Sequence, residues 1–274
     1  MSRSWHDRLL LALTPHQLVW AHWQGGWGKR KVAQGRRDYP PAMPAASGAV
    51  ATLQQMLAEH GLRKARGFVV LSNHFVRYQM LPWTDAIVSE AELIAYSRQR
   101  FIEVHGEAAR DWAVCVDRPV YGRPLLSSAI DGGLLESLQA CCDRNGLRLV
   151  SVTPHLAILI NTMRSLLREA SAWFVLREAD KLILLLARAG VWEAIATRRA
   201  TAHLSEEIPT LLERTSRLHG LVKPPRRVYL WGVEEGMLEE TGSWRFEHLP
   251  QHPPHTEATS MARLCALAFS PVGP

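Results

Sequence analysis

Residues 8–26, RLLLALTPHQLVWAHWQGG, decide the fold because residues 181–199, KLILLLARAGVWEAIATRR, repeat the same order of features. Each stretch has an apolar run, a short turn and a second apolar run that carries an early tryptophan, Trp20 or Trp192. About 4–6 strand-forming residues on either side of polar or glycine-containing turn residues predict a β-hairpin. A hairpin that recurs about 170 residues later predicts that the chain contains two copies of one structural unit.

Composition favours a folded protein of two lobes. The 274 residues are 47% hydrophobic and 21% charged, which is typical of a globular chain. A chain of this length fits two domains of ordinary size. Its longest apolar runs are far shorter than the ~20 residues that a membrane-spanning helix needs, so we expect no spanning segment. The apolar run at residues 9–13 is preceded by Asp7 and stopped by Pro15, which favours a strand over a signal peptide.

Charge and cysteine content argue against two further classes. A net charge of +6 would suit a nucleic-acid-binding protein. The basic residues come in short groups at the ends of predicted strands, however, so we expect solvated strand ends and no nucleic-acid partner. The four cysteines have no metal-ligand spacing and predict free, buried thiols in a reducing cytoplasm. They are Cys115, Cys141, Cys142 and Cys265.

Hydrophobic periodicity and turn residues predict the order of elements. In the first half we expect strands 8–13, 17–23, 29–34, 68–71, 75–81, 112–117, 124–130 and 147–152, and helices 48–60, 89–105 and 133–144. In the second half we expect helix 156–168, strands 172–177, 181–187, 191–197 and 228–231, helix 205–219 capped by Ser205, a loop-rich region 233–257 and a helix 258–268.

Three further stretches fit this order, together with the two hairpins: FVVLSNHFVRYQMLPW at 68–83, RRVYLWG at 226–232 and MARLCALAF at 261–269. Together they make the chain resemble the duplicated ribonuclease-H-like unit of the actin-like superfamily. It is similar to the PilM and GspL group, the actin-like cytoplasmic components of type IV pilus and type II secretion machinery. The resemblance implies an α/β, two-lobed actin-like fold with mixed five-stranded sheets. The first lobe would span 1–155, with an inserted subdomain near 85–130, and the second lobe would span 156–274 without a large insertion.

The same resemblance identifies where a nucleotide would bind. Members of the superfamily that bind ATP carry an Asp-x-Gly type turn in each hairpin and a Gly-Gly pair after the late strand. The equivalent positions in this sequence hold Thr14 and His16, then Arg188 and Gly190, and then Gly232. Since neither predicted turn has an acidic residue to anchor a metal ion, we expect no nucleotide, no cofactor and no ATPase activity. These departures bring the chain closer to the GspL type.

Other catalytic chemistry finds little support in the sequence. Twelve histidines include no H-E-x-x-H pair, and we expect no metal site. A ribonuclease-H-like nuclease needs carboxylates on its central strands, and strands 8–13 and 181–187 contain none. Asp180 lies just before a strand, where turn formation accounts for it. A Ser–His–acid arrangement stays open on sequence alone, although no G-x-S-x-G elbow is present.

The partner surface is predicted from exposed aromatic and basic residues. Trp23 and Trp27 flank Gly25-Gly26 and are the tryptophans least easily buried. The extra elements of the first lobe would form a groove near Trp83 and Phe101, with Arg98 and Arg100 able to meet acidic residues of a peptide. A sheet edge of the first lobe could also accept the peptide.

The resemblance therefore implies a non-catalytic assembly protein of a pilus or secretion platform. It would bind the cytoplasmic tail of an inner-membrane partner, and it would be cytoplasmic and recruited to the inner face of the inner membrane. Two alternatives remain: a nucleotide-binding actin-like ATPase or sugar-kinase-like enzyme, and a basic nucleic-acid-binding module. The sequence does not identify the partner, the oligomeric state or the system served.

Overall fold

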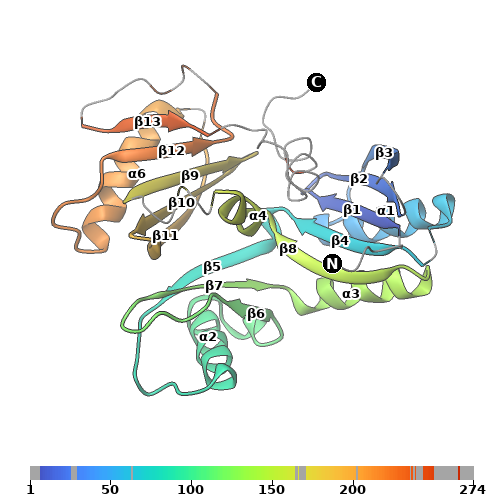
Figure 1. Ribbon diagram of the computed structural model, residues 1–274, viewed down its shortest axis with the longest axis horizontal. Coiled ribbons are helices and arrows are strands. Elements are labelled where there is room, and N and C mark those ends of the chain that lie inside the picture. The colour runs from blue at the N-terminus through green and yellow to red at the C-terminus, as the bar shows by residue number, and fades with distance from the viewer. Residues whose placement is uncertain are drawn as a thin grey trace.

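Two five-stranded sheets and a smaller three-stranded sheet form the protein, as a computed structural model shows (Figure 1). The structure describes residues 7–25, 30–62, 64–163, 166, 171–201, 203–234, 236, 238, 243–249 and 265. Within these ranges, no helix is both long and apolar enough to cross a membrane.

The first lobe contains a mixed sheet with the strand order β3-β2-β1-β4-β8. Strands β1, β2 and β3 form an antiparallel meander, and helix α1 then crosses over so that β4 returns parallel to β1. Helix α1 ends where Gly61 takes a left-handed conformation, with φ of 58°. The elements of this lobe are β1 (Arg8–Leu13), β2 (Gln17–Gln24), β3 (Arg30–Asp38), α1 (Ala45–His60), β4 (Arg66–Leu71), α3 (Gly132–Arg144) and β8 (Arg148–Pro154).

The second lobe repeats this topology with the strand order β11-β10-β9-β12-β13. Its first three strands again form an antiparallel meander, and β12 returns parallel to β9 after helix α6. The predicted duplication is therefore confirmed. The elements are β9 (Ala172–Glu178), β10 (Lys181–Arg188), β11 (Val191–Arg199), α6 (Leu204–Leu218), β12 (Arg227–Trp231) and β13 (Arg245–His248).

An inserted subdomain separates β4 from β8 in the first lobe. It contains a 3₁₀ turn η1 (Asn73–Phe75), β5 (Val76–Leu81), α2 (Glu90–His105), a 3₁₀ turn η2 (Glu107–Ala109), β6 (Ala113–Val116) and β7 (Leu125–Ile130). The strands form an antiparallel sheet in the order β5-β7-β6. Strands β5 and β7 also lie against β11 of the second lobe, where Arg123 Nη1 lies 3.8 Å from Glu193 Oε1.

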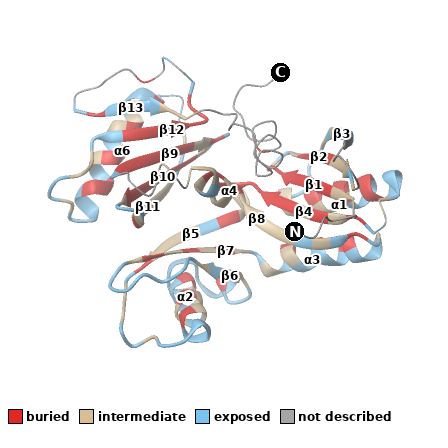
Figure 2. Ribbon diagram, in the orientation of Figure 1, coloured by how far each residue is buried: buried red, intermediate tan, exposed pale blue. Residues whose placement is uncertain are grey.

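Both large sheets are covered on both faces, which explains their almost uninterrupted apolar strands. One face of each sheet packs against helix α4 (His155–Thr162), which lies between the lobes (Figure 1). The opposite face of the first sheet packs against α1 and α3, and the opposite face of the second packs against α6. Figure 2 shows the resulting buried strands at the centre of each lobe.

Several sequence expectations need correction. Strand β13 lies in the region expected to be loop, and it completes the second sheet by pairing parallel to β12. Helix α6 begins after His203 rather than at a Ser205 cap. Strand β3 continues to Asp38, and α1 begins at Ala45, three residues before the predicted start. Cys115 is exposed, whereas the other three cysteines are buried. Residues 164, 165, 167 and 168 of the predicted helix 156–168 lie outside the described residues. The predicted helix 258–268 also lies outside them, except for Cys265.

The two similar hairpins are not equivalent in the fold. The first is β1–β2, which opens the first meander, whereas the second is β10–β11, which closes the second meander. The equivalent of β1–β2 is therefore β9–β10, whose turn contains Glu178, Ala179 and Asp180. The expectation that neither equivalent turn has an acidic residue is wrong for the second lobe.

Candidate functional site

The ends of several strands meet where the two lobes join. Strand β4 ends at Leu71 and leads into Ser72 and η1, and the Ser72 N–H donates to the Leu13 carbonyl at the end of β1 (2.8 Å). Strand β8 leads directly into His155, the first residue of α4. From the second lobe, the β9–β10 turn presents Glu178 and Asp180. Parallel strand ends gather side chains from distant parts of the sequence in this way.

Glu178 is the centre of the cluster, and its side chain is almost fully buried. One carboxylate oxygen accepts hydrogen bonds from Asn73 N (3.2 Å), Asn73 Nδ2 (2.7 Å) and His155 Nδ1 (2.9 Å). The other oxygen accepts a short hydrogen bond from Ser72 Oγ. All the donors come from the first lobe or from α4, so the carboxylate joins the two lobes directly.

A second group of contacts surrounds this carboxylate. His74 Nε2 lies 2.7 Å from Asp180 Oδ1, and His74 Nδ1 lies 2.9 Å from Ser72 Oγ. Lys181 Nζ donates to the backbone carbonyls of Asn73 and Val76. The acidic turn of the second lobe is thus held against η1 of the first lobe by opposite charges and hydrogen bonds.

The electrostatics of the cluster favour the charged forms of its acid and histidine. Burial would raise the pKa of Glu178, but hydrogen bonds with His155, His74 and Ser72 outweigh burial and hold that pKa well below its usual range. Burial would lower the pKa of His74, but its bonds to Glu178 and Asp180 raise it overall. Burial, together with nearby Arg77, lowers the pKa of Lys181 to about 8.

Ser72, His74 and Asp180 follow one another in the order of a Ser–His–acid relay. The geometry does not support hydrolysis, because Ser72 is fully buried and donates its hydroxyl hydrogen to Glu178. A nucleophile needs an exposed oxygen that a substrate can approach. Among the described residues, no group of three metal-binding side chains is arranged to hold a metal ion.

The predicted nucleotide positions are distributed differently from the expectation. Thr14 closes its own turn, since Thr14 Oγ1 accepts from His16 N (3.2 Å) and Gln17 N (2.9 Å). Gly232 follows β12, and its φ of 72° places it against the backbone of Arg177. Both positions lie beside the Glu178 cluster. Thr14 directly follows Leu13, whose carbonyl accepts from Ser72 N–H, and Gly232 lies against Arg177, which directly precedes Glu178.

Arg188 and Gly190 lie elsewhere. They lie at the turn between β10 and β11, whereas Lys181 lies at the other end of β10. Eight strand residues span about 26 Å, so this turn is far from the Glu178 cluster. Arg188 Nε pairs there with Glu193 Oε2 at 3.2 Å. The sequence patterns did not predict a site role for Glu178, Ser72, Asn73 and His155. Aligning the first strand of the second meander with the first strand of the first meander would have revealed the acidic turn, because Arg-Glu-Ala-Asp at 177–180 then corresponds to the first hairpin turn.

The predicted partner residues do not gather at one surface. Trp23 is partly buried against the core between the lobes, and Trp27 lies outside the described residues. Phe101 is fully buried and packs against Trp112, with 6.0 Å between ring centroids, so it offers no contact surface. The structure thus contradicts a partner contact by Phe101 itself, although Trp112, against which it packs, lines the groove between the first lobe and the inserted subdomain.

The other three residues lie apart from one another. Trp83 lines a pocket at the far end of the inserted subdomain. Arg100 forms an ion pair with Glu103 on the exposed face of α2. Arg98 is half-buried, and its Nε is enclosed. None of the three lines the groove between the first lobe and the inserted subdomain.

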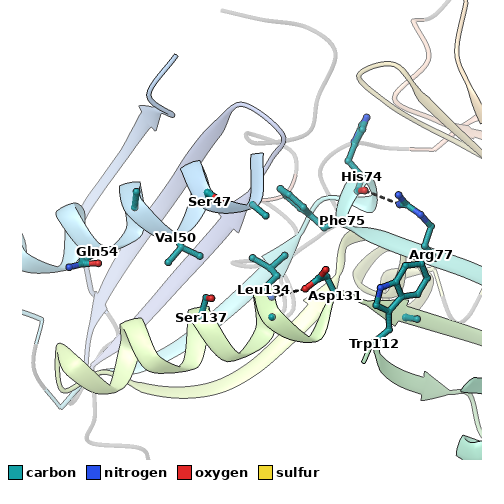
Figure 3. A pocket seen from close by; sticks show the side chains of 14 residues that line it. Ser47, Val50, Gln54, His74, Phe75, Arg77, Trp112, Asp131, Leu134 and Ser137 are labelled. Carbon is teal, nitrogen blue, oxygen red and sulfur yellow. Dashed lines mark hydrogen bonds between the residues drawn. The ribbon is translucent and has the colours of Figure 1, made fainter. Parts of the chain in front are cut away.

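That groove has a volume of about 610 Å³ and lies between α1, α3 and the start of the inserted subdomain (Figure 3). Phe75, Arg77 and Trp112 form one side, and the N-terminal half of α1 forms the opposite side. Arg77 Nη1 donates to the carbonyls of His74 (3.1 Å) and Val76 (3.3 Å). Among the described residues, no carboxylate forms an ion pair with Arg77, so its charge is available to a ligand; the carboxylate of Asp131 also lines the groove, where it accepts from Leu134 N at the start of α3 (3.0 Å).

Comparison with known proteins identifies the fold. No family profile matches the chain, and no curated protein matches its sequence. The structure is similar to the cytoplasmic domain of EpsL, an inner-membrane component of the type II secretion system of Vibrio cholerae (TM-score 0.57, 13% identity, 95% of this chain and 94% of that chain).

Two further solved structures cover most of the chain. One is from the PilM–PilN type IV pilus biogenesis complex (TM-score 0.59, 15% identity, 97% of each chain). The other is a Bacteroides thetaiotaomicron protein of unknown function with an actin-like ATPase fold (TM-score 0.57, 10% identity, 85% and 84%). The chain therefore has the two-lobed actin-like fold that its sequence predicts.

Proposed function

We propose that this chain is a non-catalytic assembly component of a type IV pilus or type II secretion platform, recruited to the cytoplasmic face of the inner membrane by the tail of a membrane partner. One observation carries the proposal: the side chain of Glu178 and its donors form a buried, bonded cluster where the lobes meet. A nucleotide would have to displace a buried, fully bonded carboxylate to reach these strand ends. Likeness to EpsL and to a structure of the PilM–PilN complex supports the assembly role.

The groove between the first lobe and the inserted subdomain is the proposed site for the tail. Its apolar wall, with Phe75 and Trp112, suits the side chains of an extended peptide. Arg77 supplies an exposed guanidinium without a carboxylate partner in the described part of the chain, which favours an acidic residue in the tail. The groove thus recognises a short acidic and apolar segment.

Charge reversal at Arg77 tests this site. Arg77→Glu should weaken binding of the acidic tail peptide by about tenfold or more, because reversal adds repulsion to the lost attraction. Arg100→Glu is a matched control, since Arg100 lies on α2, outside the groove. The peptide would come from the cytoplasmic segment of a membrane protein that co-purifies with the chain from its own organism.

Calorimetry or fluorescence from Trp112 would measure the affinity. Equal affinity of wild type and Arg77→Glu would reject the groove as the site. A weaker complex with Arg100→Glu alone would instead favour the surface first inferred from sequence, around Arg98 and Arg100. Failure to recover any membrane partner would reject the assembly role itself.

A nucleotide-binding ATPase is the second candidate, and the acidic β9–β10 turn is the observation that favours it. Asp180 is half-exposed, and it lies where an acidic turn residue of the second lobe is expected in ATP-binding members of the superfamily. Asp180 is nevertheless bonded to His74 and lies 3.1 Å from Arg199 Nε. Magnesium-dependent binding of ATP, measured by calorimetry, would favour this alternative.

A further inference from the structure

A second pocket, of about 640 Å³, lies at the far end of the inserted subdomain, away from the groove at Arg77. It is bounded by the loop between β5 and α2, the first turns of α2, and strand β6. Its floor belongs to a small separate core of Leu81, Leu93 and Leu125. The pocket is thus built on regular elements rather than on a single loop.

Large apolar side chains surround the pocket and lie open to solvent. Val88 is 85% exposed, and on the neighbouring loop Val120 is 51% and Tyr121 82% exposed. Tyr121 packs edge-on against Trp83, with 5.3 Å between ring centroids, so the two loops form one apolar surface. Contiguous exposed apolar surface of this kind marks a site of interaction.

Strand β6 adds an open sheet edge to the pocket. Within the described residues, β6 pairs only with β7, so its outer backbone N–H and C=O groups have no strand partner. Val114, Cys115 and Val116 of β6 also line the pocket. An extended peptide can pair with such an edge while its side chains enter an adjacent pocket.

Acidic side chains predominate around this surface, although the whole chain is basic. Glu90 and Asp117 line the pocket, and Arg118 is the only lysine or arginine that does so. Two more carboxylates are fixed at the rim: Asp85 Oδ1 accepts from Trp83 Nε1 (2.9 Å), and Glu92 Oε2 accepts from Val88 N (2.9 Å). The charge therefore complements a basic ligand.

We propose that the pocket and the open edge of β6 together bind an extended segment of a partner protein that carries both apolar residues and lysine or arginine. The segment adds a fourth strand to the inserted sheet. Its apolar side chains enter the pocket, and its basic side chains meet Glu90 and Asp117. This surface is distinct from the groove at Arg77 in place and in charge, so the protein can hold two different partners at once.

Cys115 is a built-in reporter for the test. It lies exposed on β6, whereas Cys141, Cys142 and Cys265 are buried, so a thiol reagent added to the native protein reacts first at Cys115. Random 12-residue peptides displayed on phage would be selected on the full wild-type chain. Each enriched peptide would then be synthesised and its affinity measured at low and high salt.

We expect enriched peptides to combine apolar and basic residues, to bind more weakly as salt increases, and to slow the reaction of Cys115 by about tenfold or more at saturation. The double variant Glu90→Lys/Asp117→Lys should lose this binding. Glu103→Lys, a charge reversal on the same helix away from the pocket, should retain it.

Several results would overturn the proposal. These are the absence of any enriched peptide, enrichment without a basic bias, unchanged Cys115 reactivity, or equal binding to the double variant. Protection of Cys115 by vesicles of anionic phospholipid but not by peptides would identify a membrane surface instead.

Discussion

Replacing Glu178 tests whether the buried carboxylate holds the lobes together. Glu178→Ala removes the acceptor of four hydrogen bonds and leaves donors of Ser72, Asn73 and His155 buried without it. Breaking a buried charged interaction by removing one partner costs about 3–5 kcal/mol. Each kcal/mol lowers the Tm of a protein of this size class by about 2–4 °C, so we expect a decrease of about 6–20 °C.

Glu178→Gln is the matched variant, because it keeps the shape and removes the charge. Its amide oxygen can still accept from Asn73 and His155, while its amide nitrogen faces Ser72. We expect a smaller loss of about 1.5–3 kcal/mol, the range for a hydrogen bond to a charged group. Glu59→Ala should change stability by less than about 1 kcal/mol, because Glu59 forms an exposed ion pair with Arg37.

Thermal and urea unfolding would measure these changes, and a small carboxylate adds a specific check. Formate can occupy the space left in Glu178→Ala and accept from the same donors. At ten times its dissociation constant it would restore about 1.4 kcal/mol. A Tm decrease below about 2 °C in Glu178→Ala, or an equal formate effect on wild type, would refute the reasoning.

Four further outcomes are expected. The folded protein should lose stability as pH falls below 4.5, the usual pKa of Glu178, since the lowered pKa contributes its full stability above that value and progressively less as pH falls toward the folded-state pKa; acid unfolding of Glu178→Gln should show a shallower loss. The raised pKa of His74 contributes stability below 6.5 that is lost as pH rises above it, and His74→Gln should remove that part of the pH dependence in urea titrations. Wild type should give no calorimetric signal with magnesium and ATP at micromolar concentration, and a clear binding isotherm would contradict this. Gly232→Ala should be more destabilising than Gly61→Ala, because a Cβ at 232 would lie 2.2 Å from the Arg177 carbonyl oxygen, whereas a Cβ at 61 would have no heavy atom within 4 Å; both glycines have positive φ, which alone costs about 1–2 kcal/mol, so equal Tm decreases would rule out the steric conflict.

The sequence predicts most elements correctly because strands that are buried on both faces consist of nearly continuous apolar runs. Runs such as Leu9–Leu13 and Leu182–Ala187 are typical of strands covered on both faces, and Gly61 marks a helix end. The four-residue β13 was missed because a short edge strand with charged residues such as Arg245 and Glu247 resembles a loop.

Apolar runs could not reveal which hairpins are equivalent in the two lobes. They also could not reveal the polar cluster around Glu178. Strand β10 takes part in two hairpins, and β10–β11 resembles β1–β2 in sequence because its second strand carries an early tryptophan, Trp192. Ser72 and Asn73 have the composition of a strand break, and Asp180 that of a turn. Their contacts with the second lobe join residues more than a hundred positions apart, which only the fold brings together.

The pairing of β4 with β8 has a consequence for how the chain is made. Strand β8 pairs with β4 from Arg66 to Leu71, but the whole inserted subdomain is synthesised between them. At about 5–20 residues per second, the roughly 80 intervening residues take about 4–16 s to emerge from the ribosome. During that interval the apolar β4, on the first sheet of the nascent chain, has an unpaired edge. Slower translation across the insertion would prolong this exposure, so the timing of synthesis bears on the yield of folded protein.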